Sequence, residues 1–162
     1  MRYKTGLVIG RFQPFHKGHA YLLGKALEVA DTLIIGVGSS DTIDDDNPFL
    51  ITTRRNMISQ YIQKTGLESR IPKIIDIPDM PDDDEWFEAL KKKVGRFDVG
   101  IGNNDWVRGI FENARMPFVV IGNYQRDIWE GTQIRELMRE KKMWQDRVPE
   151  EISHLIQVEG LE

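Results

Sequence analysis

Five short apolar runs, separated by segments with helical spacing, constrain the fold of this chain more than any other feature. The runs are rich in valine and isoleucine, are mostly unbroken by polar residues, and occupy positions 5–10, 32–38, 73–78, 97–102 and 117–122. Such runs are typical of strands that are covered on both faces. Strands that alternate with helices form βαβ units with right-handed crossovers. We therefore expect a doubly wound, Rossmann-like parallel α/β sheet of about five strands with flanking helices.

The segments between the runs carry apolar residues three and four positions apart, as one face of a helix requires. In the first segment Leu23, Ala26 and Leu27 recur with this spacing. Helices are predicted at about 17–30, 52–65, 83–94, 104–114 and 132–140, and a final one at about 149–158. The 162 residues show no linker and no break in composition, so we expect a single domain over 1–162.

Composition excludes several classes of protein. The chain has no cysteine, which excludes a disulfide scaffold and a cysteine nucleophile and fits a cytoplasmic location. No apolar run approaches the roughly 20 residues of a membrane-spanning helix. The 22 Lys and Arg residues against 26 Asp and Glu residues give a net charge of −4, so we expect no general affinity for nucleic acid. An anion must therefore bind at a local cluster of donors.

The stretch that follows the first expected strand is the most distinctive motif. It reads GRFQPFHKGH from Gly10 and runs into the first expected helix, where α/β sheets bind their ligands. Two of the three histidines, His16 and His19, lie here, and His19 falls in the first turn of that helix. Free N–H groups in such a turn attract anions. Arg11 adds a fixed charge, and Gly10 and Gly18 allow close approach of the backbone, so the motif predicts a phosphate site.

Two other interpretations of this stretch stay open. It could be a strand-to-helix turn with two solvent-facing histidines. The His-x-x-His spacing also occurs at zinc sites, although no third ligand stands at a recognisable spacing. The acidic runs at 44–46 and 82–85 likewise invite a metal interpretation, but solvated loop charge explains them without one.

The stretch at 10–19 resembles the His-x-Gly-His signature of nucleotidyltransferases, in the form found in archaeal-type nicotinamide-nucleotide adenylyltransferases. The resemblance implies that His16, His19 and Arg11 are catalytic: they hold ATP phosphates and stabilise the transition state of adenylyl transfer. It implies ATP and nicotinamide mononucleotide (NMN) as substrates, NAD and pyrophosphate as products, and Mg²⁺ bound mainly through the ATP phosphates. It further implies a homo-oligomer, for example a hexamer, with no nucleic-acid or membrane partner.

Two further segments agree with the resemblance on the phosphate side. In NPFLITTRRNMI, at 47–58, the family arginine that opens the next helix aligns best with Arg54, although Arg55 is its neighbour. Near the other end of the chain, the segment GTQIR resembles the second family signature, Ser/Gly-Thr-x-Ile-Arg. Its Thr132 and Arg135 are implied to meet the polyphosphate from the opposite side, and Arg126 aligns with another family arginine. A simple helix cap with an exposed arginine is the alternative.

The same resemblance extends to the nucleoside and pyridine ends of the substrates. Gly102 and Asn103 are similar to the family's adenosine-side turn, and Ser39 lies in a turn similar to its Gly-x-Gly-Ser. Trp86 resembles the aromatic residue that stacks on the pyridine ring, which suits a cationic ring; simple packing of a helix is the alternative. Asp83 stands where an Asn is expected, which leaves the preference between NMN and nicotinate mononucleotide open.

The motifs offer phosphate donors but no activated nucleophile. We therefore expect direct in-line attack of the mononucleotide 5′-phosphate on the α-phosphorus of ATP. Two alternatives stay open, namely an adenylyltransferase that acts on FMN or phosphopantetheine and a non-catalytic adenine-nucleotide sensor. Gln13, where those relatives usually carry an Asp, and Trp86 argue against the first. The intact His16, His19 and Arg135 argue against the second.

Overall fold

All five predicted strands form, and they join in one parallel sheet with the order β3-β2-β1-β4-β5. The computed structural model describes residues 2–158. The strands are β1 (Tyr3–Gly10), β2 (Ala30–Val37), β3 (Lys73–Asp76), β4 (Val99–Gly102) and β5 (Phe118–Val120). The two long strands, β1 and β2, are paired with each other at inner positions of the sheet. Apolar side chains cover both faces of these strands.

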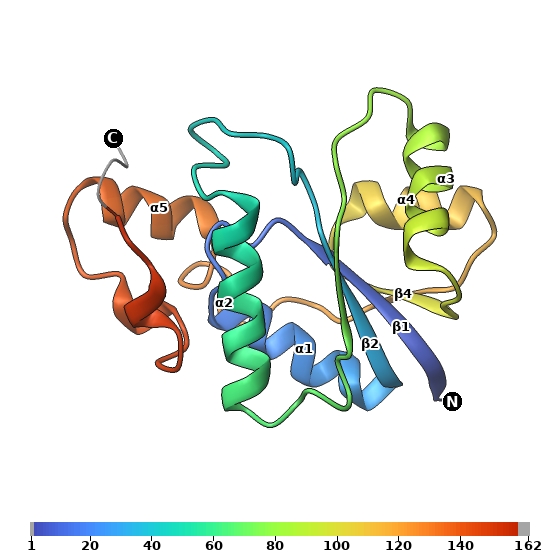
Figure 1. Ribbon diagram of the computed structural model, residues 1–162, viewed down its shortest axis with the longest axis horizontal. Helices are drawn as coiled ribbons and strands as arrows, with labels where there is room; N and C mark the ends of the chain where they lie inside the picture. The colour runs from blue at the N-terminus through green and yellow to red at the C-terminus, as the bar shows by residue number, and fades with distance from the viewer. Residues whose placement is uncertain (1, 159–162) are drawn as a thin grey trace.

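The five helices lie where the apolar spacing predicted them. They are α1 (Lys17–Val29), α2 (Ile51–Lys64), α3 (Asp83–Val94), α4 (Asp105–Asn113) and α5 (Gly131–Arg139). The first two cover one face of the sheet, and α3 with α4 covers the other, so that two apolar clusters sandwich the strands (Figure 1). Within residues 2–158, no helix has both the length and the apolar content of a membrane span.

The strand order creates a switch point between β1 and β4. Successive strands step from β1 through β2 to β3, and the chain then crosses back to place β4 on the other side of β1. Val8 of β1 pairs with Ile101 of β4, so the loops that follow these two strands leave the sheet side by side. Connections at a switch point depart to opposite faces, which opens a crevice for ligands.

The prediction of a final helix at 149–158 is wrong. The structure has two short 3-10 helices here, η1 (Gln145–Arg147) and η2 (Ser153–Leu155), joined by turns. Ile152 and Ile156 are both buried, so these turns already place the apolar side chains of the segment in the core. A helix of this length gains little stability by itself, and burial of the side chains decides the local conformation.

Candidate functional site

A cavity of about 240 Å³ opens at the switch point between β1 and β4. It joins the loop after β1, the first turns of α1, the loop after β4 and the segment that leads into α5. Six of the residues that the sequence predicted for the site line this cavity: Gly10, His16, Gly18, His19, Asn103 and Arg126. The structure therefore brings three separate predicted segments together.

Hydrogen bonds to the backbone fix both histidine rings. His16 is the N-cap of α1, and its Nδ1 accepts the N–H of Gly18 at 3.0 Å. His19 Nδ1 accepts the N–H of His16 at 3.1 Å. Because each Nδ1 is an acceptor, the proton of each neutral ring belongs on Nε2. A side chain at position 18 would contact the His16 ring at 2.8 Å, so glycine is required there.

Both imidazoles are held in the neutral state. Burial lowers the pKa of His16 to about 3, with a smaller contribution from the charge of Arg135. The His19 ring packs against Phe12 and Phe15, and this burial, followed by the neighbouring His16, lowers its pKa well below the ordinary value. The two rings can therefore donate through Nε2 at neutral pH without carrying charge.

The two signatures from opposite ends of the sequence meet at one loop. Arg135 is 3% exposed, and its Nη1 donates to the carbonyl of Gln13 at 2.8 Å, across 122 positions of the chain. Gly131 makes this approach feasible, because a Cβ there would lie 2.8 Å from Arg135 Nη1. Burial lowers the pKa of Arg135 most, and the charge of Arg11 lowers it further. The two guanidinium groups therefore lie close enough to repel each other. Like charges gathered in this way favour an anion.

The acidic loop that precedes α2 lies over these arginines. Arg11 Nη1 donates to Asn47 Oδ1 at 3.4 Å, and Arg135 Nη2 is 3.8 Å from Asp46 Oδ1. The Asp46 side chain is 76% exposed, so this ion pair is open to water and weak. An amide and a carboxylate therefore supply only partial compensation for the clustered positive charge.

Arg54, which was predicted to contact phosphate, is not among the residues that line the cavity. Its side chain is completely buried, and it donates to the carbonyls of Arg11 at 3.0 Å, Gly38 at 2.8 Å and Ser39 at 3.1 Å. These bonds tie the loop after β1 to the loop after β2. Arg55, the alternative in the sequence, turns the other way and pairs with a carboxylate on β3.

The predicted mononucleotide contact Ser39 is part of a hydrogen-bonded turn. Its hydroxyl donates to Asp79 Oδ1 at 2.9 Å, and Thr42 donates to the other oxygen of the same carboxylate at 2.7 Å. Ser39 has φ 48, and Phe12 in the neighbouring loop has φ 55. Left-handed backbone at residues other than glycine costs about 1 kcal/mol or more and is typical of functional loops.

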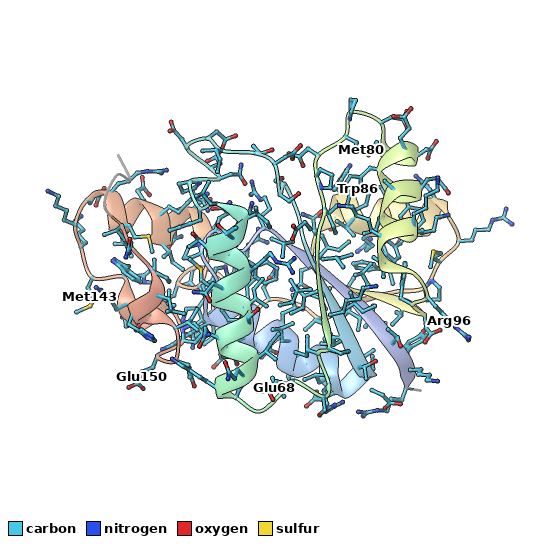
Figure 2. The ribbon with its side chains drawn as sticks, viewed as in Figure 1. Glu68, Met80, Trp86, Arg96, Met143 and Glu150 are labelled. Atoms are coloured by element: carbon cyan, nitrogen blue, oxygen red, sulfur yellow. The ribbon has the colours of Figure 1, made fainter. Side chains whose placement is uncertain are left out.

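Trp86, which was predicted to stack on the pyridine ring, is largely buried in this structure. It is 4% exposed and lies on the side of α3 that faces the centre of the molecule (Figure 2). The ring of Trp106 covers it, with centroids 4.7 Å apart. Trp106 is 47% exposed, and its Nε1 donates to Asp83 Oδ1 at 3.1 Å. The first turns of α3 and α4 pack side by side, and this packing decides which tryptophan faces water.

The remaining predicted residues lie at the loops that flank the cavity. Gly102 ends β4, and Asn103 exchanges two hydrogen bonds with the backbone of Gly122, at 2.7 and 3.1 Å. Thr132 lies exposed in the first turn of α5, and its hydroxyl accepts from Arg135 at 3.3 Å. No side chain caps α5, so the N–H groups of its first turn are available to an acceptor.

The role of Gln13 was not evident from the sequence, in which it stands out only as a family difference. Gln13 is 3% exposed and exchanges two hydrogen bonds with the backbone of Phe49, at 2.9 and 3.3 Å. A polar residue among the aromatic residues of the first motif was the available signal, because a buried amide needs partners. Tyr124 and Trp129, which also line the cavity, carried no signal in the sequence.

The family follows from a match along nearly the whole chain. A model described as cytidylyltransferase-like matches residues 7–160. The chain belongs to the cytidylyltransferase-like family. Relatives named nicotinamide-nucleotide adenylyltransferase agree: the one from Thermococcus onnurineus is 33% identical and covers 98% of this chain and 86% of its own length. The one from Thermoplasma acidophilum is 32% identical and covers 98% of this chain and 88% of its own.

A solved structure agrees with this family assignment. It is a bifunctional NMN adenylyltransferase/ADP ribose pyrophosphatase from Francisella tularensis, complexed with AMP and a manganese ion. It superposes with a TM-score of 0.77 at 25% identity, over 90% of this chain and 44% of that protein. The resemblance to nucleotidyltransferases and the Rossmann-like fold, both predicted from the sequence, are confirmed.

Proposed function

We propose that this protein transfers AMP from ATP to NMN and so produces NAD and pyrophosphate. The observation that carries the proposal is the cavity at the switch point, where His16 and His19 meet Asn103 and Arg126. Arg135 reaches the loop that leads to these histidines, at Gln13. The relatives named nicotinamide-nucleotide adenylyltransferase support the choice of both substrates.

The proposed reaction is a single in-line displacement. An oxygen of the NMN 5′-phosphate attacks the α-phosphorus of ATP, and the bond from that phosphorus to the α,β-bridging oxygen breaks. Pyrophosphate leaves with the electron pair of that bond. No base has to remove a proton, because the phosphate monoester, with a second pKa near 6, is already ionised at neutral pH. Catalysis then consists of positioning and charge stabilisation.

Each group in the site has a distinct task in this reaction. The Nε2–H donors of His16 and His19 stabilise the phosphate oxygens that gain charge, and Arg11 adds a fixed positive charge. Arg135 and the uncapped first turn of α5 hold the departing pyrophosphate. Arg54 joins the loop after β1, which carries Arg11, to the loop after β2.

Magnesium fits this site as a companion of ATP. Among residues 2–158, no three histidine, aspartate or glutamate side chains gather in a way that could hold a metal ion. The donors around the cavity are N–H groups, which bind phosphate oxygens. Brought in with ATP, magnesium would neutralise part of the charge on the phosphates.

The test is an assay of purified protein with magnesium, ATP and NMN, in which the dinucleotide product is identified by mass. We expect NAD, and we expect His19→Ala to lower kcat by about 10²–10³, the usual cost of one lost transition-state donor. His154, exposed in η2 outside the cavity, offers the matched control His154→Ala, which should retain the wild-type rate. An inactive wild type, or equal rates for both variants, would contradict the proposal.

The same assay separates the alternatives. Replacing NMN with FMN or phosphopantetheine tests the sibling activities, and tight ATP binding without any product identifies a nucleotide sensor. A homo-oligomer and a cytoplasmic location stay predictions from the family resemblance and from the composition. Light scattering of the purified protein measures the first of these.

A further inference from the structure

The acidic loop before α2 contacts α5, although the two segments are far apart in the sequence (Figure 1). The Asp46 carboxylate lies 3.8 Å from Arg135 Nη2, and the carbonyl of Asp45 accepts a hydrogen bond from Arg139 Nη2. Arg135 is 3% exposed, whereas the side chain of Asp46 is 76% exposed. Of these two partners, only the carboxylate can therefore swing into solvent without disturbing the core.

A hydrogen-bonded turn holds Asp46 in this position. The Asp44 carboxylate accepts from the backbone N–H groups of Asp46 and Asn47, at 2.9 and 2.8 Å, and from the side-chain amide of Asn47 at 2.9 Å. Asn47 is 5% exposed, and its own Oδ1 accepts from Arg11 Nη1 at 3.4 Å. The turn thus presents Asp46 to Arg135 without help from a ligand.

The charge of Asp46 acts on Arg135 as an anionic ligand would. Burial lowers the pKa of Arg135 most and the charge of Arg11 lowers it further, whereas the charge of Asp46 opposes both. A carboxylate and a phosphate also present similar oxygens to a guanidinium group, because each can accept two of its N–H donors. The carboxylate therefore takes part of the role that a phosphate would have beside this arginine.

Arg135 has few donors left for a second anion. Its Nη1 donates to the carbonyl of Gln13, three positions before His16, and its Nη2 donates to Thr132 Oγ1 at 3.3 Å and also faces Asp46. In the proposed reaction this guanidinium group holds the departing pyrophosphate. An oxygen of the pyrophosphate and the carboxylate of Asp46 therefore seek the same nitrogen.

From these contacts we propose that Asp46 is a built-in competitor of the pyrophosphate group: its carboxylate pairs with Arg135 in the empty site and is displaced when the polyphosphate binds. The inference rests on the proposed function, because it concerns how the same arginine holds and releases the same group. When pyrophosphate leaves, the carboxylate returns to Arg135. Asp46 thereby lowers the affinity for this product and favours its release.

The ligand wins this competition because it carries more charge and more acceptors than one carboxylate. A pyrophosphate can accept from Arg11 and Arg135 together, through charge-assisted hydrogen bonds. The ion pair that it replaces is exposed to water and therefore weak. Displacing Asp46 thus has a small but definite cost, and this cost sets the size of the expected effect.

The test is calorimetric titration of the intact protein with pyrophosphate and magnesium at physiological ionic strength. Asp46→Asn keeps the size of the side chain, removes its charge and should tighten pyrophosphate binding about two- to fivefold, the range for an exposed ion pair. The matched control Asp45→Asn removes an equal charge from the same turn but keeps the carbonyl that contacts Arg139. It should change the Kd less, because salt screens charges that are not in contact with the ligand.

Three results would overturn the inference. If Asp46→Asn and Asp45→Asn tighten pyrophosphate binding equally, the effect is one of net charge and no competition exists. If Asp46→Asn binds pyrophosphate more weakly than wild type, the carboxylate holds the ligand in place instead of opposing it. Adenosine, which has no phosphate, should bind equally to wild type and Asp46→Asn, so an equal gain with adenosine would likewise contradict the inference.

These outcomes are distinguishable from failure of the proposed function, which the formation of NAD by wild type decides. If wild type forms NAD but Asp46→Asn binds pyrophosphate as wild type does, the inference is wrong and the proposed function stands. If Asp46→Asn gains affinity for pyrophosphate but wild type forms no NAD, the competition stands and the proposed function is wrong. If neither protein binds pyrophosphate, the inference is wrong.

Discussion

The two histidines of the first motif show how a side chain can serve structure and chemistry with different atoms. In each ring Nδ1 accepts a backbone N–H and completes the start of α1, while Nε2 keeps a proton to donate. Burial lowers the pKa of both rings, so this division persists through the neutral range. Neutral donors also spare the protein the cost of placing two further positive charges beside Arg135.

The depressed pKa of His16 predicts acid sensitivity. The unfolded chain takes up a proton near pH 6.5, but the folded protein does so only near pH 3, so the stability that this neutral ring provides is lost as pH falls between these values. At pH 5 the loss should be about 2 kcal/mol relative to pH 7.5. His16→Asn keeps a capping acceptor but does not titrate, so urea denaturation should show a smaller loss for the variant. Parallel losses in the two proteins would contradict this.

At the scale of elements, the site depends on loops that are tied to one another. Arg54 of α2 bonds to the loops after β1 and β2, and Gln13 bonds to the backbone before α2. Asn103 joins the loops after β4 and β5 in the same manner. Loops are ordinarily the mobile parts of a parallel α/β fold, and these side chains hold the phosphate donors in register.

Adjacent arginines in α2 provide a test of this joining role. Arg54→Ala leaves three carbonyls without their charged donor and should lower the free energy of unfolding by about 3 kcal/mol. Arg55→Ala removes a half-exposed ion pair and should cost less than about 1 kcal/mol. Urea denaturation without nucleotide measures both variants. A residue that served only to bind phosphate would not stabilise the nucleotide-free protein, so a small effect of Arg54→Ala would overturn the joining role.

At the scale of the whole molecule, positive charge is concentrated at one point of an acidic protein. The chain has a net charge of −4, yet Arg11, Arg54 and Arg135 lie close together. Burial is the main cause that lowers the pKa of Arg54 and Arg135, and the charge of Arg11 lowers both further. The site lies where the two halves of the sheet and α5 meet. A polyphosphate there would relieve repulsion and connect these parts.

Binding of ATP should therefore stabilise the entire domain. At a concentration 100 times its Kd, ATP with magnesium should add about 2.7 kcal/mol, which for a domain of this size raises Tm by about 5–10 °C. Differential scanning calorimetry measures the shift. Adenosine, which lacks the phosphates, is the control and should produce a much smaller shift at the same concentration. Equal shifts with both ligands would show that the arginines and histidines contribute nothing to binding.

Much of this architecture could be predicted from local sequence patterns. Unbroken Val/Ile runs specify buried parallel strands, and regular apolar spacing located α1 to α5, because each pattern reflects one face or both faces in the core. The helix predicted at 149–158 does not form, because Ile152 and Ile156 can reach the core from short turns as well as from a helix. The family was readable for a similar reason, since the motif at 10–19 is local and specific.

The sequence by itself determined the five strands, the helices α1 to α5 and the family, because these depend on neighbours along the chain. Only the tertiary structure decided which of two adjacent arginines is buried and which of two tryptophans is exposed. Arg54 is held by the carbonyls of two loops, and Trp106 is held by a carboxylate on another helix. Such partners are distant in sequence, and spacing within one segment carries no information about them.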